Sequence, residues 1–95
     1  MSNMTNSNWT KDAFDGECEW TLDNGQFTAT VTRECEDFAS GSSRARGTKV
    51  TGYAIQVDAN ERGSGFKVRT AYVAAGENAR VALKQAMRLA ESMMA

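Results

Sequence analysis

Histidine is absent from this chain of 95 residues, which removes the commonest general base and the commonest metal ligand. Cysteine occurs only twice, at Cys18 and Cys35, and two cysteines without histidine make a poor zinc site. No apolar run approaches the ~18 residues that cross a membrane, and residues 1–8 lack the apolar stretch of a secretory signal. We therefore expect a cytoplasmic protein with reduced thiols and neither metal nor cofactor.

Charge is divided unevenly between the two halves of the chain. Residues 1–40 hold eight acids and two bases, whereas residues 41–95 hold nine bases and four acids. The formal net charge of −1 hides this division. Charge asymmetry between halves points to electrostatic recognition of a partner.

Two segments with alternating polar and apolar residues flank an Asn-Gly pair. Residues 17–22 and 27–32 are predicted to form a hairpin with Asn24-Gly25 as its two-residue loop. This register pairs Leu22 with Phe27, and a slip of one residue would exchange the two faces. The apolar face then holds Cys18, Trp20, Leu22, Phe27, Ala29 and Val31.

A second hairpin is predicted from residues 53–57 and 66–72, which are joined by a glycine-bearing loop. Pairing Val57 with Phe66 brings Tyr53, Ile55 and Val68 to one apolar face. The outer face of the second strand then carries Lys67 and Arg69. Residues 33–48 break the pattern between the two hairpins.

Helical signals lie at both ends of the chain. Near the N-terminus, Thr10 is a candidate cap for one helical turn, in which Trp9 packs on Phe14. At the C-terminus a helix is predicted over residues 77–93, with Ala75 or Gly76 as a weak cap. Its apolar stripe comprises Ala79, Ala82, Leu83, Ala86, Ala90 and Met93.

The fold class that follows is α+β, in a single domain over residues 9–95. A four-stranded antiparallel sheet from two hairpins carries the C-terminal helix packed on one face, with a short N-terminal helical turn. Residues 1–8 are expected to be a flexible leader, and 39–47 a mobile surface loop. Hairpins and short helices need tertiary support, which is expected from Trp20, Phe27, Tyr53, Ile55, Val68 and Leu83.

No group of residues indicates catalysis. Cys18 is interpreted as a small core residue and Cys35 as a free thiol at a strand end. Glu17 and Glu19 project together, and paired carboxylates can serve acid–base chemistry. Here they are expected to face water beside threonines rather than an apolar pocket. We therefore expect no enzyme and no catalytic residue.

Acidic residues gather at one end of the first predicted hairpin. Such a negative lobe can dock on a basic groove, including one meant for nucleic acid, and speeds association by steering. The alternative is an acidic edge that keeps the sheet from pairing with other sheets. The lobe comprises Asp12, Asp15, Glu17, Glu19, Glu34, Glu36 and Asp37.

Basic residues form two predicted groups. Lys67 and Arg69 share an outer sheet face, and Arg80, Lys84 and Arg88 form a ridge on the helix. A nucleic-acid surface would want one continuous patch with interleaved aromatic residues, whereas these groups point in opposite directions. Protein-partner binding, direct nucleic-acid binding and an ordinary solvated surface all remain open for them.

Residues 65–94 run from a strand over 65–73 through a short turn into an Ala- and Met-rich helix. In composition and order this segment resembles the endings of small phage-encoded anti-CRISPR proteins, particularly those directed at type I interference complexes. The resemblance implies a compact, cytoplasmic, non-enzymatic inhibitor that occupies a surface of a surveillance complex or its nuclease. That family has no shared site residues to carry over.

We therefore expect a non-enzymatic binding protein, a phage anti-CRISPR inhibitor. It would dock on a host type I CRISPR interference complex and block nucleic-acid binding or nuclease recruitment. The alternative is a small nucleic-acid-binding module that uses the basic C-terminal half. Neither hypothesis involves a membrane.

Overall fold

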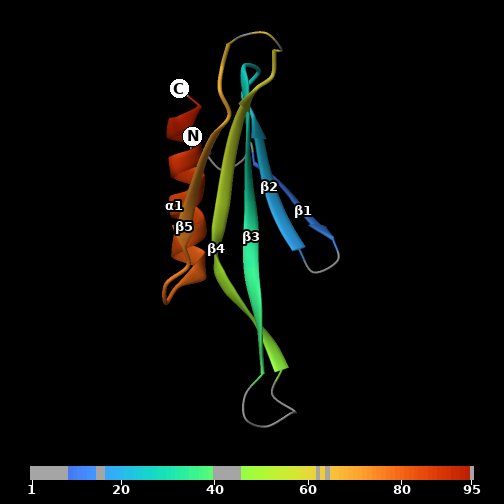
Figure 1. Ribbon diagram of the computed structural model, residues 1–95, viewed down its shortest axis with the longest axis vertical. Coiled ribbons are helices and arrows are strands. Elements are labelled where there is room, and N and C mark those ends of the chain that lie inside the picture. The colour runs from blue at the N-terminus through green and yellow to red at the C-terminus, as the bar shows by residue number, and fades with distance from the viewer. Residues whose placement is uncertain (1–8, 15–16, 40–45, 62, 64, 95) are drawn as a thin grey trace, which may run out of the picture.

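Five antiparallel strands form one sheet in the described part of the chain, and a single helix packs across it (Figure 1). The computed structural model describes residues 9–14, 17–39, 46–61, 63 and 65–94, without the side chains of 14, 37–39 and 46–48. The predicted leader, residues 1–8, lies outside these ranges. The elements are β1 (Thr10–Phe14), β2 (Glu17–Asp23), β3 (Phe27–Ala39), β4 (Arg46–Ala59), β5 (Arg69–Ala74) and α1 (Ala79–Met93).

The spatial order of the strands is β1-β2-β3-β4-β5, so each strand pairs with the next along the chain. The α+β class, the antiparallel sheet and the C-terminal helix are therefore confirmed. The number of strands is five rather than the predicted four.

The additional strand, β1, replaces the helical turn predicted at the N-terminus. Thr10 lies opposite Thr21, and Asp12 lies opposite Glu19, so the segment follows the free edge of β2. A single helical turn has a costly nucleus, whereas a strand edge offers partners for the backbone N–H and C=O groups. Trp9 is not confined to a local turn, because its indole Nε1 donates to the Glu91 carboxylate of α1 at 3.0 Å.

The β2–β3 hairpin keeps the predicted faces with different partners. Asn24 donates its amide to the Phe27 carbonyl at 3.1 Å, which makes Gly25-Gln26 the two-residue loop. Moving the loop by one residue shifts the pairing by two, so Trp20 lies opposite Val31. An even shift leaves every side chain on its predicted face.

Two side chains before the loop account for its position. Asp23 Oδ1 accepts the amide of Gly25 at 2.8 Å, and Asn24 Oδ1 accepts the amides of Gln26 and Phe27 at 2.9 and 2.8 Å. Asn and Asp side chains favour turns through such bonds to the backbone two residues on. Gly25 thereby takes the first loop position with φ of 94°, a conformation that costs glycine little.

β3 and β4 are longer than predicted, because pairing continues through residues 33–48, which had been interpreted as a break. The ladder extends to Ala39 opposite Arg46, with one register shift between Glu34 and Cys35. This part of the ribbon projects beyond the neighbouring strands (Figure 1). Of the predicted loop 39–47, both ends belong to strands, and residues 40–45 lie outside the described ranges.

The β4–β5 pairing differs from the predicted register by three residues. Val57 lies opposite Arg69 rather than Phe66. An odd shift exchanges the two faces of a strand. As a result Val68, predicted in the core, is 49% exposed, and Tyr72 is 51% exposed on the outer face.

Phe66 accounts for this shift. It stays in the connection before β5, where its ring centroid lies 4.8 Å from that of Phe27. Because Phe66 packs there instead of pairing with Val57, the strand begins only at Arg69. An aromatic contact between the connection before β5 and the first residue of β3 has thus overridden the local alternation.

α1 begins at Ala79, two residues later than predicted, because Asn78 is its cap. Asn78 Oδ1 accepts the amides of Arg80 and Val81 at 3.1 and 3.2 Å. Asparagine is a strong N-cap, whereas alanine is a poor one. The predicted apolar stripe is confirmed, since Ala82, Ala86 and Ala90 are buried.

The core lies between α1 and one face of the sheet. α1 packs against β3, β4 and β5, and the Trp20 and Tyr53 rings meet edge-to-face at 5.9 Å. Phe27 and Leu83, both predicted in the core, are partly buried against it. The buried cluster comprises Cys18, Trp20, Leu22, Ala29, Val31, Tyr53, Ile55, Val57, Ala82, Ala86, Ala90 and Met94.

Candidate functional site

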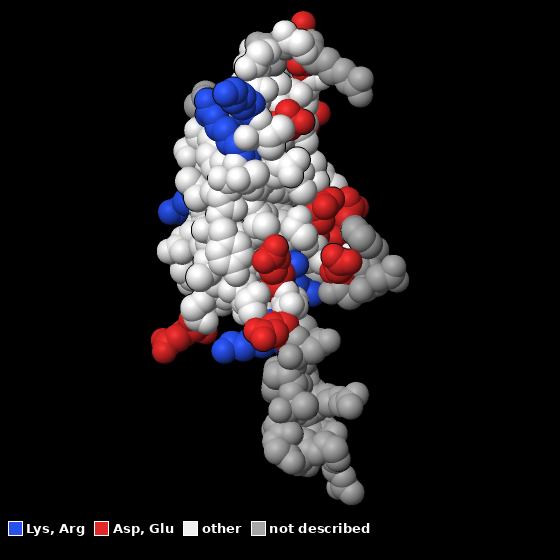
Figure 2. Space-filling model, viewed as in Figure 1, with Lys and Arg blue, Asp and Glu red and all other residues white. Residues whose placement is uncertain are grey.

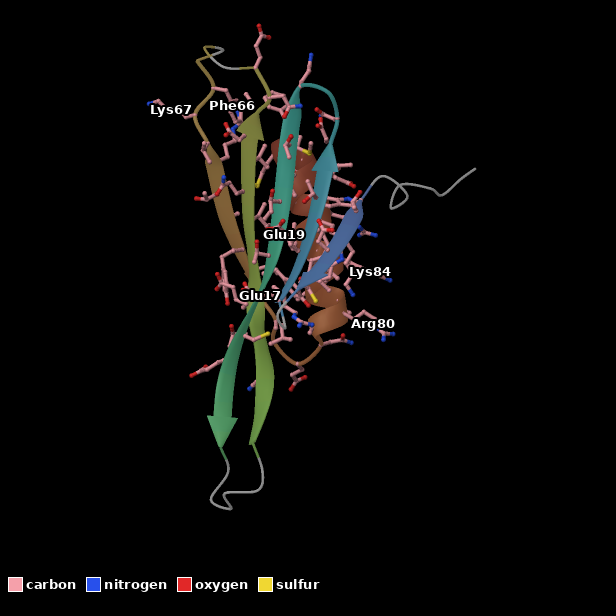
Figure 3. The ribbon with its side chains drawn as sticks, turned by 90° about the vertical axis from the view of Figure 1, so that its right-hand side faces the viewer. Glu17, Glu19, Phe66, Lys67, Arg80 and Lys84 are labelled. Carbon is pink, nitrogen blue, oxygen red and sulfur yellow. The ribbon has the colours of Figure 1, made fainter. Side chains whose placement is uncertain are left out.

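The sheet has one face covered by α1 and one face open. Figure 3 looks onto the open face, with α1 behind the strands. Because side chains alternate along each strand, the residues beside the buried ones point to this open face. We call it the open face below.

Cross-strand partners align into rows across the open face. One row is neutral and polar, and comprises Thr10, Thr21, Thr30, Gln56 and Thr70. The next row begins with two acids and ends with a phenol, and comprises Asp12, Glu19, Thr32, Ala54 and Tyr72. Because the side chains of Thr32 and Ala54, between the acids and the phenol, are short, the centre of this face forms a shallow depression.

Four carboxylates of the open face lie near one another, on β1, β2 and β3. Asp12 is directly opposite Glu19 in the β1–β2 ladder. Glu17 and Glu34 line one shallow hollow, and Glu19 lines the next. Figure 3 shows Glu17 and Glu19 in front of the sheet. We refer to Asp12, Glu17, Glu19 and Glu34 as the acidic face.

The acidic face is accessible to a partner. Asp12, Glu17 and Glu34 are exposed, and Glu19 is half-buried. Arg33 also lines the hollow that contains Glu17 and Glu34, so one positive charge lies at its margin. Figure 2 shows acidic side chains along the side of the molecule where Figure 1 places β1 and β2.

Of the remaining acids of the predicted lobe, the one with a described side chain, Glu36, does not join this group. Glu36 lies beyond the register shift, where the ladder places it opposite Lys49. Opposite charges across two strands are favourable, so Glu36 faces a lysine rather than the other acids. Asp15 and the side chain of Asp37 lie outside the described residues.

Arg69 does not share an outer face with Lys67, contrary to the prediction. The β4–β5 register turns it toward α1, where its Nη1 donates to the Met93 carbonyl at 2.9 Å. Its guanidinium also lies 4.9 Å from the Phe66 ring centroid. A cation at the carbonyl end of a helix is favourable, so Arg69 fastens α1 to β5. Lys67 precedes the strand and is exposed.

The basic ridge of α1 is present, and Arg80, Lys84 and Arg88 are all exposed. Figure 3 shows Arg80 and Lys84 on the opposite side of the molecule from Lys67. The described bases therefore form separate groups. Direct nucleic-acid binding through one continuous basic patch gains no support from this arrangement.

Both cysteines are free thiols. Cys18 is buried in the core, as predicted, whereas the exposed Cys35 lies within β3 rather than at its end. Among the described residues no group of three or more acidic or thiol side chains is arranged to hold a metal ion. None of the helices in these ranges has the length and apolar character needed to cross a bilayer.

Among the described residues, two titratable groups have shifted pKa values, each for a structural reason. Burial raises the pKa of the Tyr53 phenol, and the nearby Arg33 opposes this shift. Hydrogen bonds from the Gly25 amide and the Asn60 side chain lower the pKa of Asp23 below its ordinary 3.8. Tyr53 is a core residue, and Asp23 holds a turn, so neither shift marks a reactive site.

Tyr72 is the residue of the open face that sequence reasoning misplaced. It was predicted on the apolar side of the second hairpin. Its ring instead lies on the open face over Gly52, at the edge opposite the acidic face. Only the contact between Phe66 and Phe27, which sets the register, could have revealed this position.

Comparisons with known proteins identify no relative. The chain matches no family model, no curated protein and no solved structure.

Proposed function

We propose that this protein is a non-enzymatic binding protein that docks its acidic face on a basic surface of a protein partner. The supporting observation is the gathering of four carboxylates on the sheet face that α1 leaves open. Carboxylates directly opposite each other, such as Asp12 and Glu19, destabilise a sheet. Stability alone therefore does not account for them, whereas a cationic partner would relieve their repulsion.

The surroundings of the acidic face suit long basic side chains of a partner. The hollow beside Glu19 is lined by threonines, Ala54 and Gln56, which are short or uncharged. Lysine and arginine side chains can extend over such a surface while their charged heads reach the carboxylates. A negative field of this kind also speeds association with a positive groove.

Among basic protein surfaces, those that hold nucleic acid are the most strongly cationic class. Together with the resemblance of residues 65–94 to anti-CRISPR proteins, this favours one specific proposal. The chain is a phage inhibitor that occupies a basic groove of a type I CRISPR surveillance complex, and so blocks DNA binding or nuclease recruitment.

The test uses a purified type I surveillance complex and two matched double variants. Glu17→Lys with Glu19→Lys changes the acidic face, and Asp58→Lys with Glu61→Lys makes the same charge change at exposed positions elsewhere. The first pair should weaken binding about a hundredfold, because like charges across an interface cost several kcal/mol. The second pair should leave the dissociation constant within about threefold.

Salt and nucleic acid separate the alternatives. Binding through the acidic face should weaken between about 50 and 300 mM salt, because added ions screen exposed charges. Equal loss in both double variants would contradict the acidic face as the site. Direct binding of duplex or single-stranded nucleic acid, lost as salt rises, would favour the nucleic-acid-binding module instead.

A further inference from the structure

β5 is the last strand of the sheet and is bonded only to β4. Figure 3 shows it at the border of the sheet, with α1 behind the strands. Beyond its end, Ala75 donates its amide to the Thr51 carbonyl of β4 at 3.0 Å. Because N–H and C=O groups alternate sides along an antiparallel strand, those of Thr70, Tyr72 and Ala74 point away from the sheet.

Apart from Arg69 at its start, whose guanidinium is bonded to the Met93 carbonyl, this edge has little of the usual protection against pairing. In natural proteins, charged side chains, proline or a short length keep edge strands from pairing with other chains. From Thr70 to Gly76 the sequence has no charged residue and no proline. The opposite edge, β1, is shorter and carries Lys11 and Asp12. We therefore expect the free edge of β5 to be paired with another strand when the protein functions.

Opposite charges stand at the two ends of this uncharged edge. Lys67 lies five residues before Tyr72, Glu77 lies five residues after it, and both are exposed. Figure 2 shows basic side chains at the upper end of this side of the molecule, and an acidic one at its lower end with basic side chains beside it. β5 alone spans roughly 20 Å, so Lys67 and Glu77 of one chain lie too far apart to pair.

We propose that the β5 edge binds a second copy of this chain, strand β5 against strand β5 in antiparallel orientation. Tyr72 then lies opposite the partner's Tyr72 at a twofold axis, and Thr70 lies opposite the partner's Ala74. The backbone N–H and C=O groups of these residues point away from their own sheet. In this register they can therefore form hydrogen bonds with the partner strand. Beyond the strand, Gly76 turns the chain with φ of 61°, so Lys67 of one copy and Glu77 of the other lie at the same end of the interface, twice in the symmetric pair.

A second copy fits this edge better than an unrelated strand does. Lys67 and Glu77 lie at opposite ends of the edge, so an antiparallel copy brings opposite charges together at both ends, whereas a parallel copy brings like charges together. The Tyr72 ring lies over Gly52 of its own chain, so it leaves the β5 edge open to the partner strand. The result is a continuous ten-stranded sheet with both α1 helices on the same side.

The pairing goes beyond the proposed function and does not depend on it. It would place two acidic faces on one side of the continuous sheet, with their β2 strands roughly 34 Å apart by strand spacing. A partner that offers two basic sites at that separation would be held by both, which raises the overall affinity.

The first test blocks the edge. Thr70→Pro removes an N–H that points away from β4, and proline is tolerated on the free side of an edge strand. Sedimentation over a concentration series should show a dimer for the natural chain and a monomer for Thr70→Pro, while circular dichroism shows the variant folded. A natural chain that stays monomeric throughout, or a folded Thr70→Pro dimer, overturns the proposal.

The second test exchanges the charges and leaves the backbone intact. Lys67→Glu or Glu77→Lys alone should weaken dimerisation about five- to tenfold, since each creates two repulsive pairs at the interface. The double variant should recover the natural dissociation constant. Lys84→Glu with Glu61→Lys is the matched control and should change nothing. Failure of the double exchange to rescue would exclude the antiparallel register.

Discussion

At the scale of single residues, Gly52 shows how one missing side chain organises the open face. Gly52 is buried, and the Tyr72 ring lies over it. A Cβ at this position would meet the Tyr72 phenol and would approach the Val73 carbonyl to 2.7 Å. Glycine here is therefore a packing requirement, since its φ is not among the positive values.

Gly52→Ala should lower the free energy of unfolding by about 1–3 kcal/mol, as overpacking does in a tight site. Gly52→Ala combined with Tyr72→Ala should recover part of this loss, because the ring is removed while the Val73 carbonyl stays. Urea unfolding at one low protein concentration measures both. An unchanged midpoint for Gly52→Ala would show that the ring is free to move aside.

Asp23 is a second residue whose side chain stabilises the fold, through hydrogen bonds at the β2–β3 loop. Its Oδ1 accepts the Gly25 amide and the Asn60 Nδ2, each at 2.8 Å. Asn60 also accepts from the Thr28 hydroxyl and donates its own amide to the Gln26 carbonyl. One carboxylate thus joins the β2–β3 loop to the end of β4.

The lowered pKa of Asp23 predicts a pH dependence with a definite sign. The stabilisation is present above the ordinary pKa of 3.8 and is lost as pH falls through the lower pKa of the folded state. Asp23→Asn should therefore be less stable than the natural chain near pH 7, and the difference should vanish in strong acid.

Urea unfolding at both pH values measures this difference, and Asn60→Ala is a useful second background. It removes one of the two donors to Asp23, so the effect of Asp23→Asn should shrink there. A difference that persists in strong acid would assign the stabilisation to packing rather than to charge.

At the scale of elements, the register of each hairpin decided which predictions survived. The loop of the β2–β3 hairpin moved by one residue, which shifts pairing by two and preserves faces. The β4–β5 pairing moved by three, which exchanges faces and placed Tyr72 outside. The predicted face of each side chain thus survives a one-residue error in the position of a hairpin loop, which shifts the pairing by two. It does not survive an error that shifts the pairing by an odd number of residues.

α1 depends on its cap because the helix is short, and basic residues are absent from its described last turn. Asn78→Ala should lower the free energy of unfolding by about 0.5–2 kcal/mol, the usual cost of losing an N-cap. Gln85→Ala, at an exposed position within the helix, is the control and should change stability by less than about 0.5 kcal/mol. Thermal unfolding followed by circular dichroism measures both, and equal effects would contradict the cap.

At the scale of the whole molecule, the two-layer arrangement separates three surfaces. α1 covers one face of the sheet and carries the basic ridge outward. The open face carries the carboxylates near the β1 edge, and β5 forms the other edge. Partner docking and self-pairing can therefore proceed without competing for the same residues.

The sequence by itself determined the α+β class, the faces of β2 and β3, and the buried stripe of α1. These features are local, since alternation and helical spacing act within a few residues. The acidic character of the first hairpin was also evident. Four of the seven predicted acids do lie together, because they belong to adjacent strands.

Only the tertiary structure decided the rest. β1 is a strand because its backbone can pair with the free edge of β2. The side chains of β5 lie on the observed faces because Phe66 packs on Phe27 and so sets the register with β4. β3 and β4 extend past Glu34 because each supplies the other's backbone partners. Such choices depend on contacts between segments far apart in sequence, where long-range pairing outweighs local propensity.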